Sequence, residues 1–422
     1  MEQKTIGRLA LVSVILLSIL IAGCTGIAGT TPAQPVPPTV TADPDTMPMT
    51  DGNNWFAFDL YSQLANDPKN AESNIFFSPF SISSALAITY EGARGTTADE
   101  IRSVFHFPGN DTIRRQGFSE VDEDMNRENT SYTLRMANAL WAEKTYPFLP
   151  DYTSTARRYY SADTTNLDFI NQPEDSRRTI NQWVEDKTEN KIRDLIPNGE
   201  IDPLTRLVIT NAVYFYGTWE KPFDKTETYE YPFFITPNKT VPVQMMQRGD
   251  TFAYTETSRI QMIELPYNHG NGKELSMIVI LPKSETLAAV ENSLNAGMLL
   301  DLERTLVGTK MVVFLPKFRL ETWYKLPDTL KTMGMPTAFT PAADFSGMDG
   351  ARSLYIDDVI HKAFVDVNDE GTEAGAASSV HLTMGSHNPP TFYANHPFLF
   401  LIQNKETGTI LFIGRVVNPN SS

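Results

Sequence analysis

Hydrophobic residues in the first half of the chain recur at the three- and four-residue spacing of amphipathic helices. One such face runs from Trp55 to Leu64, and Asn53 or Asn54 is its candidate N-cap. The pattern predicts three further helices, over 81–90, after a capping box at 97–100, and over 179–192.

The second half is richer in β-branched and aromatic runs of strand length. Strands are predicted over 74–77, 132–141, 207–216, 275–281, 311–318, 359–367, 398–403 and 409–417. Helices come early and strands late, without regular alternation, which favours an α+β fold. The composition stays even from Trp55 onward, so residues 51–418 are predicted to form one domain.

The first 23 residues have the pattern of a signal peptide. Lys4 and Arg8 precede an apolar run over 9–22, which is short for a spanning helix. Small residues directly before Cys24 resemble the lipobox of prokaryotic lipoproteins, which predicts a lipid on Cys24. The alternative is an ordinary signal peptide with an incidental cysteine. The proline- and threonine-rich residues 24–50 would then form a tether holding the domain outside the cell at a membrane.

Composition limits the chemistry further. The chain carries 35 Lys+Arg and 51 Asp+Glu, a formal charge of −16, which argues against nucleic acid as a partner. Removal of residues 1–23 takes away a net +1 and leaves −17. The single cysteine excludes intrachain disulfides and a cysteine-based zinc site, and the six histidines form no metal-binding motif. We expect no cofactor, no metal and no enzymatic activity.

Residues 370–386 differ from their neighbours. The sequence EGTEAGAASSVHLTMGS is small and polar enough for an exposed loop, yet its residues alternate as in a strand. The residues on one side are small or apolar and uncharged: Thr372, Ala374, Ala376, Ser378, Val380 and Leu382. The segment is thus compatible with both a loop and a strand, as a conformational switch would require.

Four separated motifs resemble those of serpins. They are NIFFSPFS at 74–81, TNAVYFYGTWEKPF at 210–223, HKAFVDVNDEGTEA at 361–374, and NHPFLFLI at 395–402 followed by GRV at 414–416. They occur in order within the predicted domain, residues 51–418. The resemblance implies a fold of three β-sheets and eight or nine helices, with an exposed reactive-centre loop at about 369–392.

The resemblance also implies a function. Serpins are suicide-substrate inhibitors of serine proteases, and some inhibit cysteine proteases. The target acylates the loop, which then inserts as a new strand into the central sheet and traps the acyl-enzyme. We expect a monomer of this kind. The alternative is a non-inhibitory serpin that acts as a binding or carrier protein.

The same resemblance assigns the site residues. The mobile hinge would consist of Gly371, Thr372, Glu373, Ala374, Gly375, Ala376 and Ala377. Ser78, Ser81, Asn211 and His361 match a hydrogen-bonded cluster beneath the sheet, called the shutter. Trp219 matches a tryptophan at the top of the central sheet, called the breach.

The position of the reactive bond depends on how it is counted. Counting from the hinge places it after Gly385, whereas counting back from the motif at 395 places it at Ser386; Met384 is the best side chain nearby for a hydrophobic pocket. No Lys or Arg occurs over 374–392, so elastase-, chymotrypsin- or subtilisin-like targets are favoured over trypsin-like ones.

Overall fold

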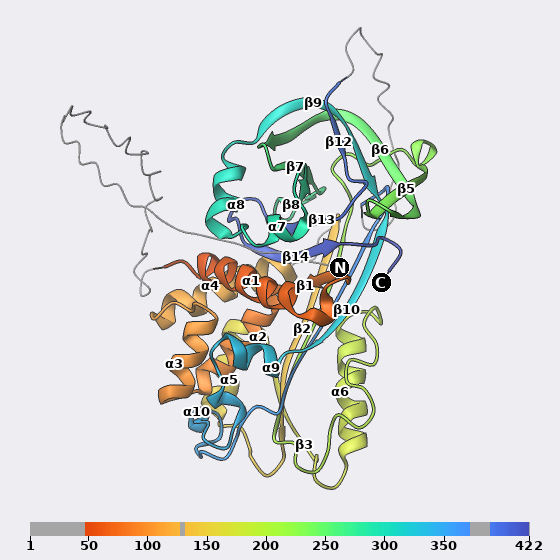
Figure 1. Cartoon of the computed structure of the whole chain (residues 1–422). Coiled ribbons are helices and arrows are strands. Elements are labelled where there is room, and N and C mark those ends of the chain that lie inside the picture. The colour runs from red at the N-terminus through yellow and green to blue at the C-terminus, as the bar shows by residue number, and fades with distance from the viewer. Residues whose placement is uncertain (1–46, 127–130, 372–388, 422) are drawn as a thin grey trace, which may run out of the picture. The chain divides into compact units, whose positions relative to one another are not determined.

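A computed structural model of the chain describes residues 47–126, 131–371 and 389–421. Two large β-sheets and the helices that cover them make up this part of the molecule (Figure 1). The ten α-helices are α1 Met49–Asn66, α2 Pro79–Gly92, α3 Gly95–Val104, α4 Asp111–Asn126, α5 Pro150–Tyr160, α6 Pro173–Lys187, α7 Leu287–Glu291, α8 Ala296–Glu303, α9 Pro327–Met333 and α10 Ser346–Asp349. The resemblance implied eight or nine helices. The described ranges contain ten because two short ones, α7 with five residues and α10 with four, are included in the count.

The central sheet has five strands in the order β10-β11-β4-β2-β3. Their bounds are β2 Tyr132–Glu143, β3 Asp163–Leu167, β4 Leu207–Gly217, β10 Phe318–Lys325 and β11 Asp358–Val367. The central strand β4 and its neighbour β11 run parallel to each other. Apolar side chains of α6 pack on one face of this sheet in a separate core cluster, and the almost wholly buried α2 contacts β2 and β4.

The second sheet has nine strands among the described residues. They are β1 Ile75–Phe77, β5 Tyr229–Thr236, β6 Lys239–Glu256, β7 Ile260–Pro266, β8 Leu275–Pro282, β9 Val307–Pro316, β12 Thr391–Tyr393, β13 Phe398–Asn404 and β14 Ile410–Val416. The 18-residue β6 pairs with β5, β7 and β9 and so joins two groups of strands into one hydrogen-bonded sheet. This connection explains why two sheets appear where the resemblance implies three.

The first helix starts earlier than its sequence pattern predicts. Met49 is its first residue, and Met47 and Met49 are already buried, so the helix includes the end of the predicted tether, 24–50. Asn53 and Asn54 are not N-caps: their side-chain amides donate hydrogen bonds of 3.0 and 2.8 Å to the carbonyls of Ile410 and Gly408.

Three other local predictions also differ from the structure. The helix predicted over 179–192 lies earlier, at Pro173–Lys187. The capping box at 97–100 is wrong, because the Thr97 hydroxyl accepts a hydrogen bond from the backbone N–H of Asp344, and the Glu100 carboxylate accepts two from Thr337. The run 311–318 covers the end of β9 and the start of β10, which are separated at Lys317. The other predicted strands are present with small shifts of their ends.

The larger core contains stacked aromatic side chains among its aliphatic ones. The ring of Phe76 on β1 stacks on Phe400 of β13 and Phe412 of β14, with centroid distances of 5.7 and 5.2 Å. Each such ring contributes roughly 2–3 kcal/mol through burial. None of the helices in the described ranges has the length and hydropathy to cross a bilayer.

Candidate functional site

The seam between β4 and β11 is paired over only part of its length. Seven residue pairs form the parallel ladder, from Asp358 opposite Val208 to Phe364 opposite Tyr214. Above that point the two strands continue to Gly217 and Val367 without pairing to each other, although both ends are described. On their outer sides they stay paired to the top, β4 with β2 and β11 with β10. Among the described residues, the seam is therefore a junction inside this sheet where two neighbouring strands run side by side without full pairing.

The chain reverses direction immediately above the seam. Asn368 and Gly371 exchange backbone hydrogen bonds of 2.8 and 3.1 Å, which closes a two-residue turn after β11. Gly371 also forms an antiparallel bridge with Thr218, the residue after β4. Its φ of 120° suits glycine, and a Cβ there would lie 2.2 Å from the carbonyl oxygen of Gly217. Gly371 thus stands between the tops of both strands.

Trp219 fixes this turn from the side of β4. Its backbone N–H donates to the carbonyl of Glu370 at 2.9 Å, and its indole N–H donates to the carbonyl of Asn368 at 3.0 Å. The indole ring stacks on Tyr267 with centroids 4.6 Å apart. The predicted breach tryptophan therefore lies directly against the base of the reactive-loop segment.

Charged side chains hold the same turn. Asp369 is 2% exposed, forms an ion pair with Lys317, and accepts a hydrogen bond from the Thr228 hydroxyl. Glu370 pairs with the more exposed Lys225, which raises the pKa of that lysine. A buried carboxylate needs such partners, because desolvation of an unpaired charge is costly.

A second polar cluster crosses the middle of the paired part of the seam. Asn211 of β4 lies opposite His361 of β11, and its side-chain oxygen is hydrogen-bonded to His361 Nδ1. The Asn211 amide donates to Ser81 Oγ, while the Ser78 N–H donates to His361 Nε2 at 3.2 Å. Ser78 also caps α2 by accepting from the Ser81 N–H at 3.1 Å. The structure thus brings together all four predicted shutter residues.

The hydrogen bonds define the state of His361. Because Nε2 accepts from a backbone N–H, the proton of the neutral ring is on Nδ1, which donates to Asn211. The side chain is fully buried, and this desolvation lowers the pKa of His361 from 6.5 to about 3. His361 is therefore an uncharged link between β4, β11 and α2 at neutral pH.

Asn138 of β2 is a member of this cluster that sequence reasoning missed. Its side-chain oxygen accepts hydrogen bonds from Asn211 and, at 3.5 Å, from Ser81. A polar residue between Ala137 and Ala139 in a buried strand was the signal that could have identified it. The ion pair of Asp369 and Lys317 was missed as well, because 52 residues separate the partners.

Several predicted site residues lie outside the described residues. They are Cys24, the hinge residues Thr372, Glu373, Ala374, Gly375, Ala376 and Ala377, and the reactive-bond candidates Met384, Gly385 and Ser386. The flanks of the loop range 369–392 are described. Asp369 and Gly371 are buried in the turn, and Thr391 begins strand β12.

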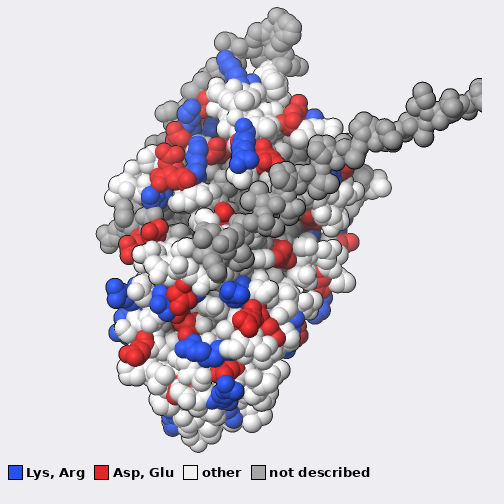
Figure 2. Space-filling model, turned by 90° about the vertical axis from the view of Figure 1, so that its left-hand side faces the viewer, with Lys and Arg blue, Asp and Glu red and all other residues white. Residues whose placement is uncertain are grey.

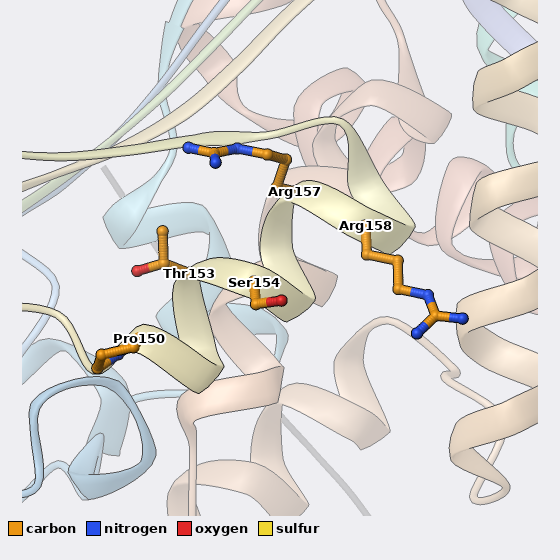
Figure 3. Close-up of a pocket in the computed structure, with 5 residues that line it drawn as sticks. All are labelled: Pro150, Thr153, Ser154, Arg157 and Arg158. Atoms are coloured by element: carbon orange, nitrogen blue, oxygen red, sulfur yellow. The ribbon is translucent and has the colours of Figure 1, made fainter.

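The described surface offers little to a small ligand or a metal. Within the described ranges no three His, Cys, Asp or Glu side chains gather as a metal site requires. A hollow of about 470 Å³ lies on α5, but its two arginines, Arg157 and Arg158, point away from each other (Figure 3). On the face shown in Figure 2, acidic and basic side chains are interspersed. The seam and its clusters are thus the candidate functional site.

These features define the class of protein. The chain belongs to the serpin family, since the family model described as serpin (serine protease inhibitor) matches residues 51–419. Members of this family are generally protease inhibitors rather than enzymes.

Individual relatives cover nearly the whole domain. An uncharacterized serpin-like protein of Thermococcus kodakarensis is 43% identical over 377 residues, which span 88% of this chain and 86% of the relative. The human leukocyte elastase inhibitor is 40% identical over 382 residues, 88% of this chain and 99% of its own. The structure of human thyroxine-binding globulin complexed with thyroxine superposes with a TM-score of 0.80 at 30% identity, covering 89% and 99% of the two chains.

Proposed function

We propose that this protein is a suicide-substrate inhibitor of serine proteases that traps its target by inserting the cleaved loop between β4 and β11. The observation that carries the proposal is the incomplete seam. Its strands pair over seven residues only, and the turn at Asn368–Gly371 already directs the chain antiparallel to both. A new strand in this position would complete the hydrogen bonds of two strand edges.

The loop has the length that this insertion needs. Fourteen residues separate Gly371 from Gly385, and at about 3.3 Å per residue they span about 46 Å. The 11 residues of β4 extend over about 36 Å by the same measure. A loop cleaved after Gly385 is thus long enough to line the whole seam. Small side chains at Thr372, Ala374 and Ala376 would fit the buried face.

Stored free energy explains why inhibition would be irreversible. Before cleavage the sheet lacks a central strand, and His361 and Asn211 hold the seam closed. After cleavage the inserted strand would add backbone hydrogen bonds and bury its inner face, which lowers the free energy and moves the attached protease. This mechanism needs no cofactor.

The lack of Lys and Arg over 374–392 favours elastase-, chymotrypsin- or subtilisin-like targets. Mixing the protein with a panel of such proteases should give a covalent complex that survives boiling in SDS. Mass measurement of the released C-terminal fragment would decide between Met384, Gly385 and Ser386. Cleaved serpin with fully active protease across the panel would refute the proposal.

A binding or carrier role is the alternative, since the similar thyroxine-binding globulin was solved with thyroxine bound. Loop cleavage separates the two functions. An inhibitor becomes far more heat-resistant once the loop inserts, whereas a cleaved carrier that cannot insert keeps its melting temperature.

We also propose that the mature chain begins at a lipid-modified Cys24 and is held outside the cell at a membrane. The motif before Cys24 supports this location. Mass spectrometry of the mature N-terminus tests it: an unmodified Cys24, or cleavage at another bond, would refute the anchor without affecting the inhibitory proposal.

A further inference from the structure

A groove of about 520 Å³ lies beside the point where the chain re-enters the body after the loop. Its lining includes Pro390 and Thr391, which form one wall, together with Tyr254 and Glu256 of β6 and Val307 of β9. Pro390 accepts a hydrogen bond of 3.0 Å from the N–H of Val312, so this wall is anchored to β9.

A chain of hydrogen bonds runs along the floor of the groove. The Gln261 amide donates to the carbonyl of Thr391 at 3.3 Å and to the Tyr254 hydroxyl at 2.9 Å. Tyr254 in turn donates to the Glu256 carboxylate at 3.0 Å. These bonds fix the groove in one geometry, which favours binding because little conformational freedom is lost on association.

The groove is open to a partner and contains a carboxylate. The side chain of Val307 is 62% exposed, which is unusual for a β-branched residue in a strand. Glu256 is 49% exposed and is bonded by Lys283 at 2.8 Å. A carboxylate has about four acceptor positions, and Lys283 and Tyr254 use two of them. Glu256 can therefore receive a further cation.

The distance to the reactive bond is short. Ser386 precedes Pro390 by only four positions, which limits the distance between them to about 14 Å. A protease domain of roughly 200 residues is about 40 Å across. A protease positioned to attack the loop can therefore reach the groove.

We propose that this groove is a second docking site for the target protease, and that it binds a surface loop carrying Lys or Arg next to the protease active site. This inference rests on the proposed inhibitory function. Glu256 attracts the basic side chain, and Val307 packs against the apolar part of the same loop. The groove adds selectivity among proteases that accept the same reactive bond, mainly through the association rate.

The test measures the second-order rate constant of attack on the reactive loop by elastase-, chymotrypsin- and subtilisin-like proteases. Attack is counted as covalent complex plus cleaved chain. Glu256→Gln should lower this rate constant about 3- to 10-fold for a protease with a basic loop beside its active site, and 0.5 M NaCl should remove most of the difference. Val307→Ala should lower it about two-fold at either salt concentration.

Glu406→Gln is the matched control. Glu406 is 47% exposed and pairs with Lys273 at 2.8 Å, almost as Glu256 pairs with Lys283, but it lies in the turn between β13 and β14. This control should attain the wild-type rate.

The outcomes separate the two proposals. Wild-type rates for Glu256→Gln and Val307→Ala with every protease would overturn the docking site, even where covalent complexes form. Slower attack by proteases that only cleave the chain would refute inhibition and support the groove. A loop that no protease attacks would overturn both.

Discussion

Replacing Asn211 by alanine should make the native state convert faster to a loop-inserted form. The change removes the hydrogen bond to His361 across the seam and the bonds to Ser81 and Asn138. It leaves the His361 Nδ1–H and the Asn138 oxygen short of partners in a fully buried setting.

The magnitude follows from these two groups. A buried polar group without a partner costs about 1–3 kcal/mol. Ser81 still donates to Asn138 at 3.5 Å, so we place the total loss of native stability at about 3 kcal/mol. A strand inserted at the seam would break the His361–Asn211 bond in the wild type too. About 2 kcal/mol of the lost native stability should therefore appear as a lower activation barrier to loop insertion. This makes the conversion roughly 30-fold faster.

The assay incubates the uncleaved protein at a fixed temperature and follows the fraction that has become resistant to unfolding in urea. Asn53→Ala is the control, because it removes a buried hydrogen bond of 3.0 Å to Ile410 between α1 and β14, away from the seam. It should lower stability without accelerating conversion. Equal conversion rates for the two variants would refute the assignment of the Asn211 cluster as the lock of the seam.

Three further predictions concern the same region. The pKa of His361 falls from 6.5 in the unfolded chain to about 3 in the folded protein, so its stabilising contribution is complete above pH 6.5 and is lost as the pH falls towards 3. Urea denaturation should therefore show that the free energy of unfolding falls by about 2 kcal/mol more between pH 7 and pH 5 in the wild type than in His361→Gln. Gly371→Ala should open the turn at the top of the seam, at a cost of about 2 kcal/mol, because its Cβ would meet the Gly217 carbonyl; hydrogen exchange at Trp219 should become faster, and unchanged protection would contradict this. Lys317→Gln should destabilise the native state by about 2 kcal/mol by leaving the buried Asp369 carboxylate without its ion pair, and Lys317→Gln combined with Asp369→Asn should recover most of the loss in thermal unfolding.

The sequence predicted the strands on both sides of the seam and the residues that lie across it. Strand β11 has two short apolar runs, Val359–Ile360 and Ala363–Val365, that its burial explains, and the motif at 210–223 contains both Asn211 and Trp219. These features were accessible because burial imposes a local pattern and because the serpin motifs are specific.

The remainder depends on contacts that no local pattern contains. The start of α1 could not be derived, since Asn53 and Asn54 bond to carbonyls more than 350 residues away and so leave no capping signal. Threonine is a common N-cap residue, but the Thr97 hydroxyl accepts its hydrogen bond from the backbone N–H of Asp344 instead. The end of the ladder at Phe364 is likewise invisible in the sequence, because periodicity gives the strands but not which rungs pair.

The bridge between Gly371 and Thr218 has a kinetic consequence. Starting a new strand is the slow step of sheet growth, because chain entropy is lost before bonds compensate it, and here the nucleus already exists. Insertion would then proceed as a zipper from this end, passing the three unpaired rungs at Phe215–Gly217 without breaking any β4–β11 bond. The first β4–β11 pair that the new strand must separate is at Tyr214. The hydrogen bond between Asn211 and His361, three pairs lower, opposes insertion further. The seam is thus open at its top and held by the Asn211–His361 cluster in its middle, and under the proposed mechanism this cluster sets the speed of insertion.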